Sequence, residues 1–160
     1  MKDPKPDPAV RSICKNRRAR YRYRIEETVE AGLVLVGPEV KSLRAGKANL
    51  VDSYARVQGG EIFLMKAHIA PYEQANRENP DPARERKLLL HRREIHRLHG
   101  KVRERGYTLV PLEMYFRDGR AKVQLGLARG KRTHDKREAI AKRETERRLQ
   151  RVRKRRSRES

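Results

Sequence analysis

Apolar and polar residues alternate along much of the chain, in short segments separated by turn residues. Residues 108–116 and 121–127 both show this alternation, and a period of two with one more apolar face is typical of half-buried strands. The Asp118-Gly119 pair between the two segments predicts a tight hairpin. Pro111 has no amide hydrogen to donate, so we expect it at a sheet edge or a bulge.

Other segments extend this strand pattern. A Gly-Gly pair at 59–60 predicts a second hairpin, which joins residues 53–57 to residues 61–69. Alternation over residues 21–25 predicts another strand. The continuous apolar run at 32–37 predicts a strand that is buried on both faces.

Two segments have the periodicity of helices. Residues 38–46 begin with a proline suited to a first helical turn and end at a glycine. A longer helix is expected over residues 91–105, where Ile95, Leu98 and Val102 fall on one face. Several short antiparallel strands with a helix at one end predict a mainly β fold, a small closed barrel of the oligonucleotide/oligosaccharide-binding (OB) type.

Composition divides the chain of 160 residues into three regions. Residues 1–12 are rich in proline and are expected to form a flexible arm. Residues 13–130 hold nearly all the large apolar side chains and are expected to form the barrel. Residues 131–160 form a basic tail, with fourteen Lys and Arg against five Asp and Glu.

Charge points to the class of partner. The formal net charge is +21, and this much self-repulsion favours a polyanionic partner, nucleic acid first and an anionic membrane surface second. The membrane alternative is weaker, because the sequence has no run of about 18 apolar residues and its N-terminus does not resemble a signal peptide. The single cysteine, Cys14, excludes an internal disulfide and fits a cytoplasmic protein.

Catalytic motifs are missing from the sequence. His91, His96 and His99 share the expected second helix, but no carboxylate or cysteine stands at metal-ligand spacing beside them. We found neither a phosphate-binding glycine loop nor a nucleophile elbow. The sequence therefore predicts a protein that is not an enzyme and holds no metal or cofactor. A metal-dependent RNA enzyme using these histidines is the weakest of three functional hypotheses.

Arginine and tyrosine interleave in residues 15–24, "KNRRARYRYR". Arginine can bind phosphate in a bidentate manner and tyrosine can stack on a base. Tyr21 and Tyr23 are equally well explained as core residues of a strand. A second basic stretch, residues 128–132, leads into the tail, and the two stretches could flank one RNA-binding groove.

The tail combines high charge with good helix formers. It has no glycine or proline between Lys131 and Ser160, and Ala, Glu, Lys, Arg, Gln and Leu dominate it. Its few apolar residues cannot stabilise an isolated helix, so we expect a disordered tail that becomes helical when phosphates neutralise it. The alternative is an adhesive basic tail without a defined bound shape.

Several strings together resemble the small protein B family, the SsrA-binding proteins of bacterial trans-translation. They are "EVKSLRAGKAN", "RKLLLH", "GYTLVPLEMYF" and "GLARGK" followed by "HDKR", in this order, and the similarity spans about residues 13–140. The chain departs from the family pattern at Lys131-Arg132, where many members have two lysines, and in its arginine-rich end.

The resemblance implies an OB-like β-barrel with peripheral helices, and a tail that is disordered until it meets the ribosome. It implies binding to the tRNA-like domain of transfer-messenger RNA (tmRNA). Together with elongation factor Tu, the tmRNA complex would enter stalled ribosomes. There the tail would contact small-subunit rRNA in the decoding centre and occupy the empty message channel.

Candidate site residues follow from the resemblance and from charge. The resemblance assigns Asn16, Glu30 and Leu89 to the tmRNA-binding face, although a leucine beside a helix start is more often a core residue when the resemblance is left aside. Charge adds six basic residues to the RNA-binding set: Arg17, Arg18, Arg20, Arg129, Lys131 and Arg132. The tail motif adds four residues expected to act in the decoding site: His134, Asp135, Lys136 and Arg137.

Two functional hypotheses remain after enzymes are set aside. The first is a monomeric RNA-binding adaptor of ribosome rescue, as the resemblance implies. The second is a structural basic RNA-binding protein of ribosomal or nucleoid type, for which charge alone would be sufficient. The two differ in selectivity for a folded RNA over random RNA.

Overall fold

The structure is a computed structural model that describes residues 9–104, 106–130 and 133–159. Its helices are α1 (Arg17–Arg22), α2 (Gly37–Arg44), α3 (Arg92–Arg103) and α4 (Thr133–Glu159), with a short 3-10 segment at Glu73–Glu78. Its strands are β1 (Val10–Lys15), β2 (Tyr23–Leu33), β3 (Ala48–Asn49), β4 (Tyr54–Gln58), β5 (Glu61–Met65), β6 (His68–Ile69), β7 (Arg86–Leu89), β8 (Tyr107–Arg117) and β9 (Arg120–Gly130).

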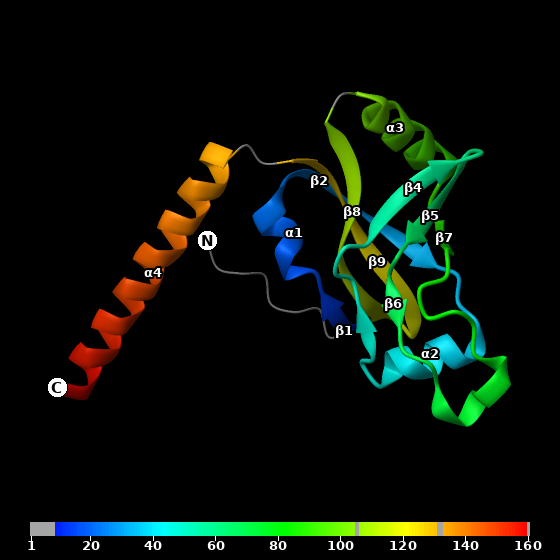
Figure 1. Cartoon of the computed structure of the whole chain (residues 1–160), viewed down its shortest axis with the longest axis horizontal. Helices are drawn as coiled ribbons and strands as arrows, with labels where there is room; N and C mark the ends of the chain where they lie inside the picture. The colour runs from blue at the N-terminus through cyan, green and yellow to red at the C-terminus, as the bar shows by residue number, and fades with distance from the viewer. Residues whose placement is uncertain (1–8, 105, 131–132, 160) are drawn as a thin grey trace.

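One antiparallel sheet organises the molecule. Its seven strands follow the order β1-β8-β4-β5-β7-β2-β9, and β8 also pairs with β9. β3 and β6 form a separate two-stranded sheet. Helices α2 and α3 lie at the two ends of the sheet, and α4 projects away from it (Figure 1). The predicted mainly β fold with peripheral helices is confirmed.

Both predicted hairpins are present, with the backbone their sequences require. Asp118 and Gly119 have φ values of 50° and 76°, and Gly59 and Gly60 have φ values of 59° and 77°. Positive φ at both central residues is typical of two-residue hairpin turns whose twist matches the strands. The expected irregularity at Pro111 is also present, because the β8–β9 register shifts between Pro111 and Glu113.

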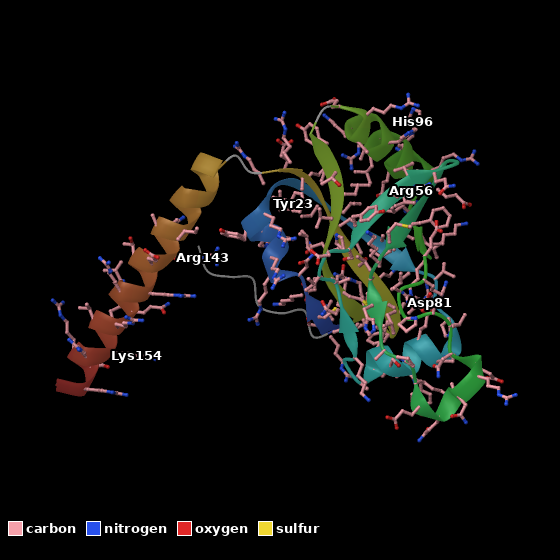
Figure 2. All side chains as sticks on the ribbon, in the orientation of Figure 1. Tyr23, Arg56, Asp81, His96, Arg143 and Lys154 are labelled. Carbon is pink, nitrogen blue, oxygen red and sulfur yellow. The ribbon has the colours of Figure 1, made fainter. Side chains whose placement is uncertain are left out.

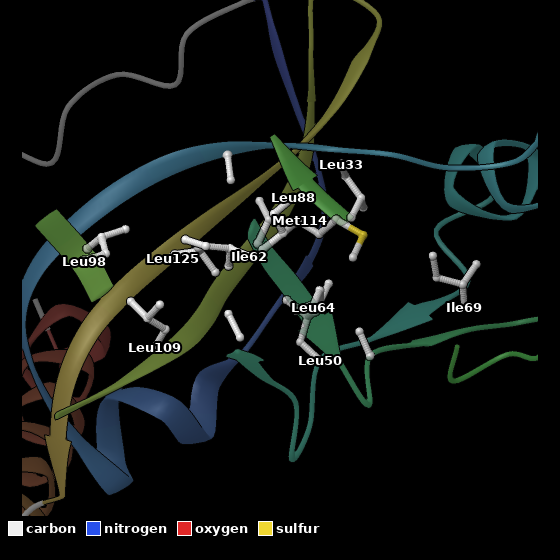
Figure 3. Packing of buried hydrophobic residues seen from close by; sticks show 14 of the residues in the cluster. Leu33, Leu50, Ile62, Leu64, Ile69, Leu88, Leu98, Leu109, Met114 and Leu125 are labelled. Carbon is white, nitrogen blue, oxygen red and sulfur yellow. The ribbon is translucent and has the colours of Figure 1, made fainter. Parts of the chain in front are cut away.

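The core lies between the strands and contains residues from nearly every one of them (Figure 3). The return strand behaves as predicted, since Val123, Leu125 and Leu127 are all buried. Leu98 of α3 is 1% exposed and anchors that helix to the sheet, as its periodicity indicated. A smaller cluster joins Ala19 of α1 to β8 and β9.

Two strand predictions need correction. The segment expected as a strand at 21–25 begins as a helix, because buried Ala19 packs α1 against the smaller cluster, and β2 starts only at Tyr23. The run at 32–37 is not a doubly buried strand. β2 ends at Leu33, and Val34 and Val36 are 42% and 44% exposed as the chain turns into α2.

The expected flexible arm also ends earlier than predicted. Its residues 10–12 belong to β1, which pairs with β8 from Val10↔Arg117 to Lys15↔Glu113. Half of the residues in β1 are exposed, so the sequence of this edge strand carries no strong apolar pattern that would predict it. Residues 1–8 of the predicted arm lie outside the described residues.

The tail forms the helix Thr133–Glu159 in this structure, and its disorder before it meets RNA stays a prediction. Its helix formers and the lack of glycine and proline explain the helical backbone. Residues 140–158 are all exposed, so the core does not cover this helix. Its contact with α1 includes the Arg143 guanidinium, 5.0 Å from the centre of the Tyr21 ring (Figure 2 labels Arg143).

Candidate nucleic-acid interface

Glu30 occupies a defined position in the middle of β2. Its Oε2 accepts hydrogen bonds from the Tyr115 hydroxyl and from Nε of Arg117, the latter at 3.0 Å. Burial, and then the hydrogen bond to Glu30, raise the pKa of the Tyr115 hydroxyl above its ordinary value. Tyr115 therefore remains protonated and continues to donate to the carboxylate.

Leu89 is the most exposed large apolar residue of the sheet, at 53%, so the alternative that it belongs to the core is wrong. It pairs with Gly32 of β2 across the β7–β2 ladder. A Cβ at Gly32 would lie 3.2 Å from Cβ of Leu89, closer than nearly all such contacts. The absence of a side chain at Gly32 therefore lets Leu89 lie against the backbone of β2.

Cross-strand register joins these two sites. Leu89 pairs with Gly32, Gly32 pairs with Lys122 of β9, and Lys122 pairs with Tyr115 of β8. We define the Glu30 face as the outer surface formed by these residues: Glu30, Gly32, Leu89, Tyr115, Arg117 and Lys122. It combines one carboxylate, one exposed apolar side chain and two cations, which can recognise hydrogen-bond donors, flat apolar groups and phosphates respectively.

Sequence reasoning identified only Glu30 and Leu89 of the Glu30 face. Lys122 was recognisable as a polar position of its alternating strand. Tyr115 and Arg117 could not be assigned, because their partner Glu30 lies 85 and 87 residues away and only the fold brings them together. Gly32 gave no signal other than being a glycine inside an apolar run.

Asn16 does not join the Glu30 face. It is 7% exposed, and its Nδ2 donates to the carbonyl oxygens of Pro111 at 2.9 Å and Leu50 at 3.3 Å. Its backbone amide donates to Leu112, one residue further along β8. Asn16 therefore fixes the start of α1 against the irregular part of β8, and its side chain is engaged inside the fold.

The predicted basic residues fall on two different elements. Arg17, Arg18 and Arg20 are exposed on α1. Arg129 is exposed near the end of β9, where its guanidinium lies 4.8 Å from the centre of the Tyr107 ring. Lys131 and Arg132 lie outside the described residues.

The two alternatives for the tyrosines near α1 are resolved differently. Tyr23 is half-buried and packs against the smaller cluster, so it contributes to the core. Tyr21 is half-buried at a cleft between α1 and α4, whose lining residues include Arg17, Arg18 and Arg143.

The tail motif residues His134, Asp135, Lys136 and Arg137 fall in the first turns of α4, and their side chains lie outside the described part of the structure.

Among the described residues, no group of three or more His, Cys, Asp or Glu side chains is arranged to hold a metal ion. Burial raises the pKa of the Cys14 thiol to about 11, which keeps this thiol protonated at neutral pH. Within the same described ranges, no helix is both long and apolar enough to cross a membrane.

The chain is similar to proteins named SsrA-binding protein. An SsrA-binding protein of Desulforudis audaxviator is 61% identical over 142 residues, 89% of this chain and 93% of the relative. One of Chloroflexus aggregans is 60% identical over 148 residues, 92% of this chain and 94% of the relative.

A solved structure described as "tmRNA-SmpB: a journey to the center of the bacterial ribosome" contains a chain that is 56% identical. The match covers 79% of this chain and 93% of that one, with a TM-score of 0.65. The profile of the SmpB protein family matches residues 13–155, which include the whole sheet from β2 to β9 and most of α4. The chain belongs to the SmpB protein family.

Proposed function

We propose that this protein is an RNA-binding adaptor of trans-translation. It binds the tRNA-like domain of tmRNA through the Glu30 face and delivers the tmRNA to stalled ribosomes for peptide tagging and release. The observation that carries this proposal is the exposure of Leu89 beside a fixed Glu30 on one sheet face. Relatives named as SsrA-binding proteins, and a related chain solved with tmRNA, support the same assignment.

The sheet acts as a closed OB-like barrel in this proposal, formed by residues 13–130. The pairings support closure, because they run from β8 through β4, β5, β7 and β2 to β9, and β9 pairs with β8 again. The stiffness of a closed sheet would hold the Glu30 face in one shape for a folded RNA.

The tail has a separate task in this proposal. Eight basic residues and no acidic residue lie between Glu146 and Glu159, so this part of α4 is a strong phosphate ligand. The helix would enter the decoding centre and the empty message channel, with His134 to Arg137 acting near its start. The protein would work as a cytoplasmic monomer, and elongation factor Tu would join through the tmRNA complex.

Replacing Glu30 by Ala tests the RNA-binding assignment. We expect affinity for the tRNA-like domain to fall about 10- to 100-fold, the usual effect of losing a hydrogen bond to a charged group. A gel-shift titration with the isolated tRNA-like RNA measures the change. Glu27→Ala is the matched control, because Glu27 is on the same strand but pairs with Arg97 of α3 outside the Glu30 face.

An unchanged affinity in Glu30→Ala, or an equal loss in Glu27→Ala, would contradict this assignment. Asn16→Ala should also weaken binding, but together with a lower stability, because it leaves the Pro111 carbonyl without its 2.9 Å donor. A urea titration of each variant separates the two effects.

A structural basic RNA-binding protein is the second candidate, supported by the net charge of +21. The two candidates respond differently to salt. Each single-strand phosphate contact adds about −0.7 to the slope of log K against log salt, so binding by phosphate contacts alone should weaken first. An adaptor should still prefer the tRNA-like domain at a salt concentration where random RNA no longer binds.

The helix content of the tail should depend on anions. Exposed helices owe little to packing, and the like charges of α4 repel one another, so we expect its helical signal in low-salt buffer to rise about twofold when RNA or polyphosphate is added. The difference in circular dichroism at 222 nm between the full chain and a chain without residues 131–160 measures this change. A difference signal that is already maximal without polyanion would show a preformed helix instead.

A further inference from the structure

We propose that Tyr115 and Arg117 are positioning residues for Glu30, and that the carboxylate they hold recognises a neutral hydrogen-bond donor of the RNA. The donor is an O–H or N–H group, supplied by a ribose 2′-hydroxyl or by the amino group of a base. This inference rests on the proposed function of the Glu30 face.

Both positioning residues reach Glu30 from a strand that is not its direct neighbour at this point. Glu30 of β2 pairs with Gln124 of β9, and β9 in turn pairs with β8, which carries Tyr115 and Arg117. The Tyr115 side chain is largely covered, at 7% exposed. Its hydroxyl therefore points to the carboxylate from a nearly fixed ring.

The two donors use the same carboxylate oxygen. The Tyr115 hydroxyl and Arg117 Nε both donate to Oε2, which fills the two lone pairs of that atom. No hydrogen bond recorded among the described residues reaches Oε1 of Glu30. The arrangement therefore orients the carboxylate while leaving one acceptor oxygen for a ligand.

Stability alone does not account for this arrangement. The Glu30 and Arg117 side chains are 38% and 41% exposed, and ion pairs this exposed contribute little to the free energy of unfolding. A carboxylate held in place before binding has less conformational freedom to lose when RNA arrives, so the same contacts improve affinity instead.

The chemistry of the held group limits its ligand. A carboxylate repels phosphate, so Glu30 cannot be a backbone-phosphate contact in a protein that otherwise attracts phosphates. It can accept from a hydroxyl or an amino group, and a ribose 2′-hydroxyl is the group that distinguishes RNA from DNA. Leu89, exposed on the neighbouring row of the same face, offers an apolar surface for the flat side of that nucleotide.

A double-mutant cycle tests the positioning role. Tyr115→Phe removes one hydroxyl and keeps the ring, and we expect it to weaken binding of the tRNA-like RNA about tenfold. In a Glu30→Ala background the same substitution should change affinity by less than about twofold, because it acts through Glu30. An equal fold-loss in both backgrounds would overturn the proposal.

Two further measurements separate positioning from a general structural effect. Random single-stranded RNA should bind wild type and Tyr115→Phe equally, since phosphate contacts are unchanged. If urea titration shows that Tyr115→Phe is destabilised, Arg117→Gln repeats the cycle from the second donor. If Glu30→Ala binds normally, the proposed function of the face fails; if only Tyr115→Phe and Arg117→Gln bind normally, the positioning role fails.

Modified RNAs identify the donor. A single 2′-deoxy substitution that weakens binding to wild type, but not to Glu30→Ala, identifies a ribose hydroxyl. The same pattern with inosine in place of guanosine identifies a base amino group. If no RNA lacking one hydroxyl or amino group shows this dependence on Glu30, the donor-recognition part is wrong.

Discussion

Replacing Glu39 by Gln is expected to lower the free energy of unfolding by about 3–5 kcal/mol, the usual result of removing one partner of a buried ion pair. Glu39 lies in α2 at 2% exposed, and its Oε2 is 2.6 Å from Nε of Arg86, which is fully buried. The substitution leaves the Arg86 guanidinium inside the protein without its counter-charge.

The Glu39–Arg86 pair also ties separate segments together. Arg86 donates to the carbonyl oxygens of Ala67 at 2.7 Å and Pro82 at 2.9 Å, and Arg84 donates to both carboxylate oxygens of Glu39. These contacts connect α2, the turn after β5 and the loop before β7. The loss should therefore affect global unfolding and not only one helix.

The same network makes stability depend on pH. Burial alone would raise the pKa of the Glu39 carboxyl, but hydrogen bonds from Arg84, the Val36 amide and Arg86 outweigh it and hold this pKa below its ordinary value. The unfolded chain therefore binds this proton more readily than the folded chain. The contribution is fully present above the unfolded pKa, about 4.3, and is lost as pH falls through the folded pKa.

Urea titrations followed by tyrosine fluorescence measure the change. Glu61→Gln is the matched control, because its ion pair with Lys87 has both side chains more than 40% exposed and should matter by less than about 1 kcal/mol. Adding Arg86→Met to Glu39→Gln should recover part of the loss, since no buried charge is then left unpaired. Equal stabilities of Glu39→Gln and Glu61→Gln would contradict the expectation.

Features set by neighbouring residues were predicted well from the sequence. The turns at Gly59-Gly60 and Asp118-Gly119 depend on the ability of these residues to adopt positive φ. Pro111 has no backbone N–H to donate in any strand, so an irregularity beside it was predictable. The phase of β8 was harder. Leu109, Met114 and Phe116 all share the main core, which a single alternation from one end of the strand to the other cannot produce.

Features set by distant residues were not predicted. Charged residues such as Glu39 and Arg86 are normally exposed, so nothing local indicates that they bury each other from positions 47 apart. The helix at α1 depends on Ala19 packing against β8 and β9. The alternation of residues 21–25 predicted a strand from Tyr21 onward, because nothing in the sequence shows this tertiary contact of α1.

The candidate site shows the same division. Glu30 and Leu89 came from motif resemblance, and the structure supplies the reason that they belong together, which is the register through Gly32. Tyr115 lies 85 residues from Glu30 in the chain, so only the fold reveals their contact. Asn16 came from the same resemblance, yet its side chain serves the fold at the start of α1.

Deleting residues 131–160 is expected to abolish peptide tagging while leaving tmRNA binding within about tenfold of the full chain at physiological salt. The last strand of the sheet ends at Gly130, so the deletion removes no strand and no residue of the Glu30 face. The remaining loss of affinity should come from phosphate contacts, and it should appear as a shallower salt dependence. Gel shifts with the tRNA-like RNA and a tagging assay on stalled ribosomes measure the two activities.

A tail of the same composition in shuffled order is the matched control for this deletion. It restores net charge and nonspecific phosphate affinity but changes which side chains share a face of α4. If the tail acts as a defined helix in the message channel, the shuffled chain should recover the salt dependence and still fail to tag. Full tagging by the shuffled chain would show that any polycation is sufficient. Loss of tmRNA binding on deletion, as severe as that of Glu30→Ala, would show that barrel and tail share one task.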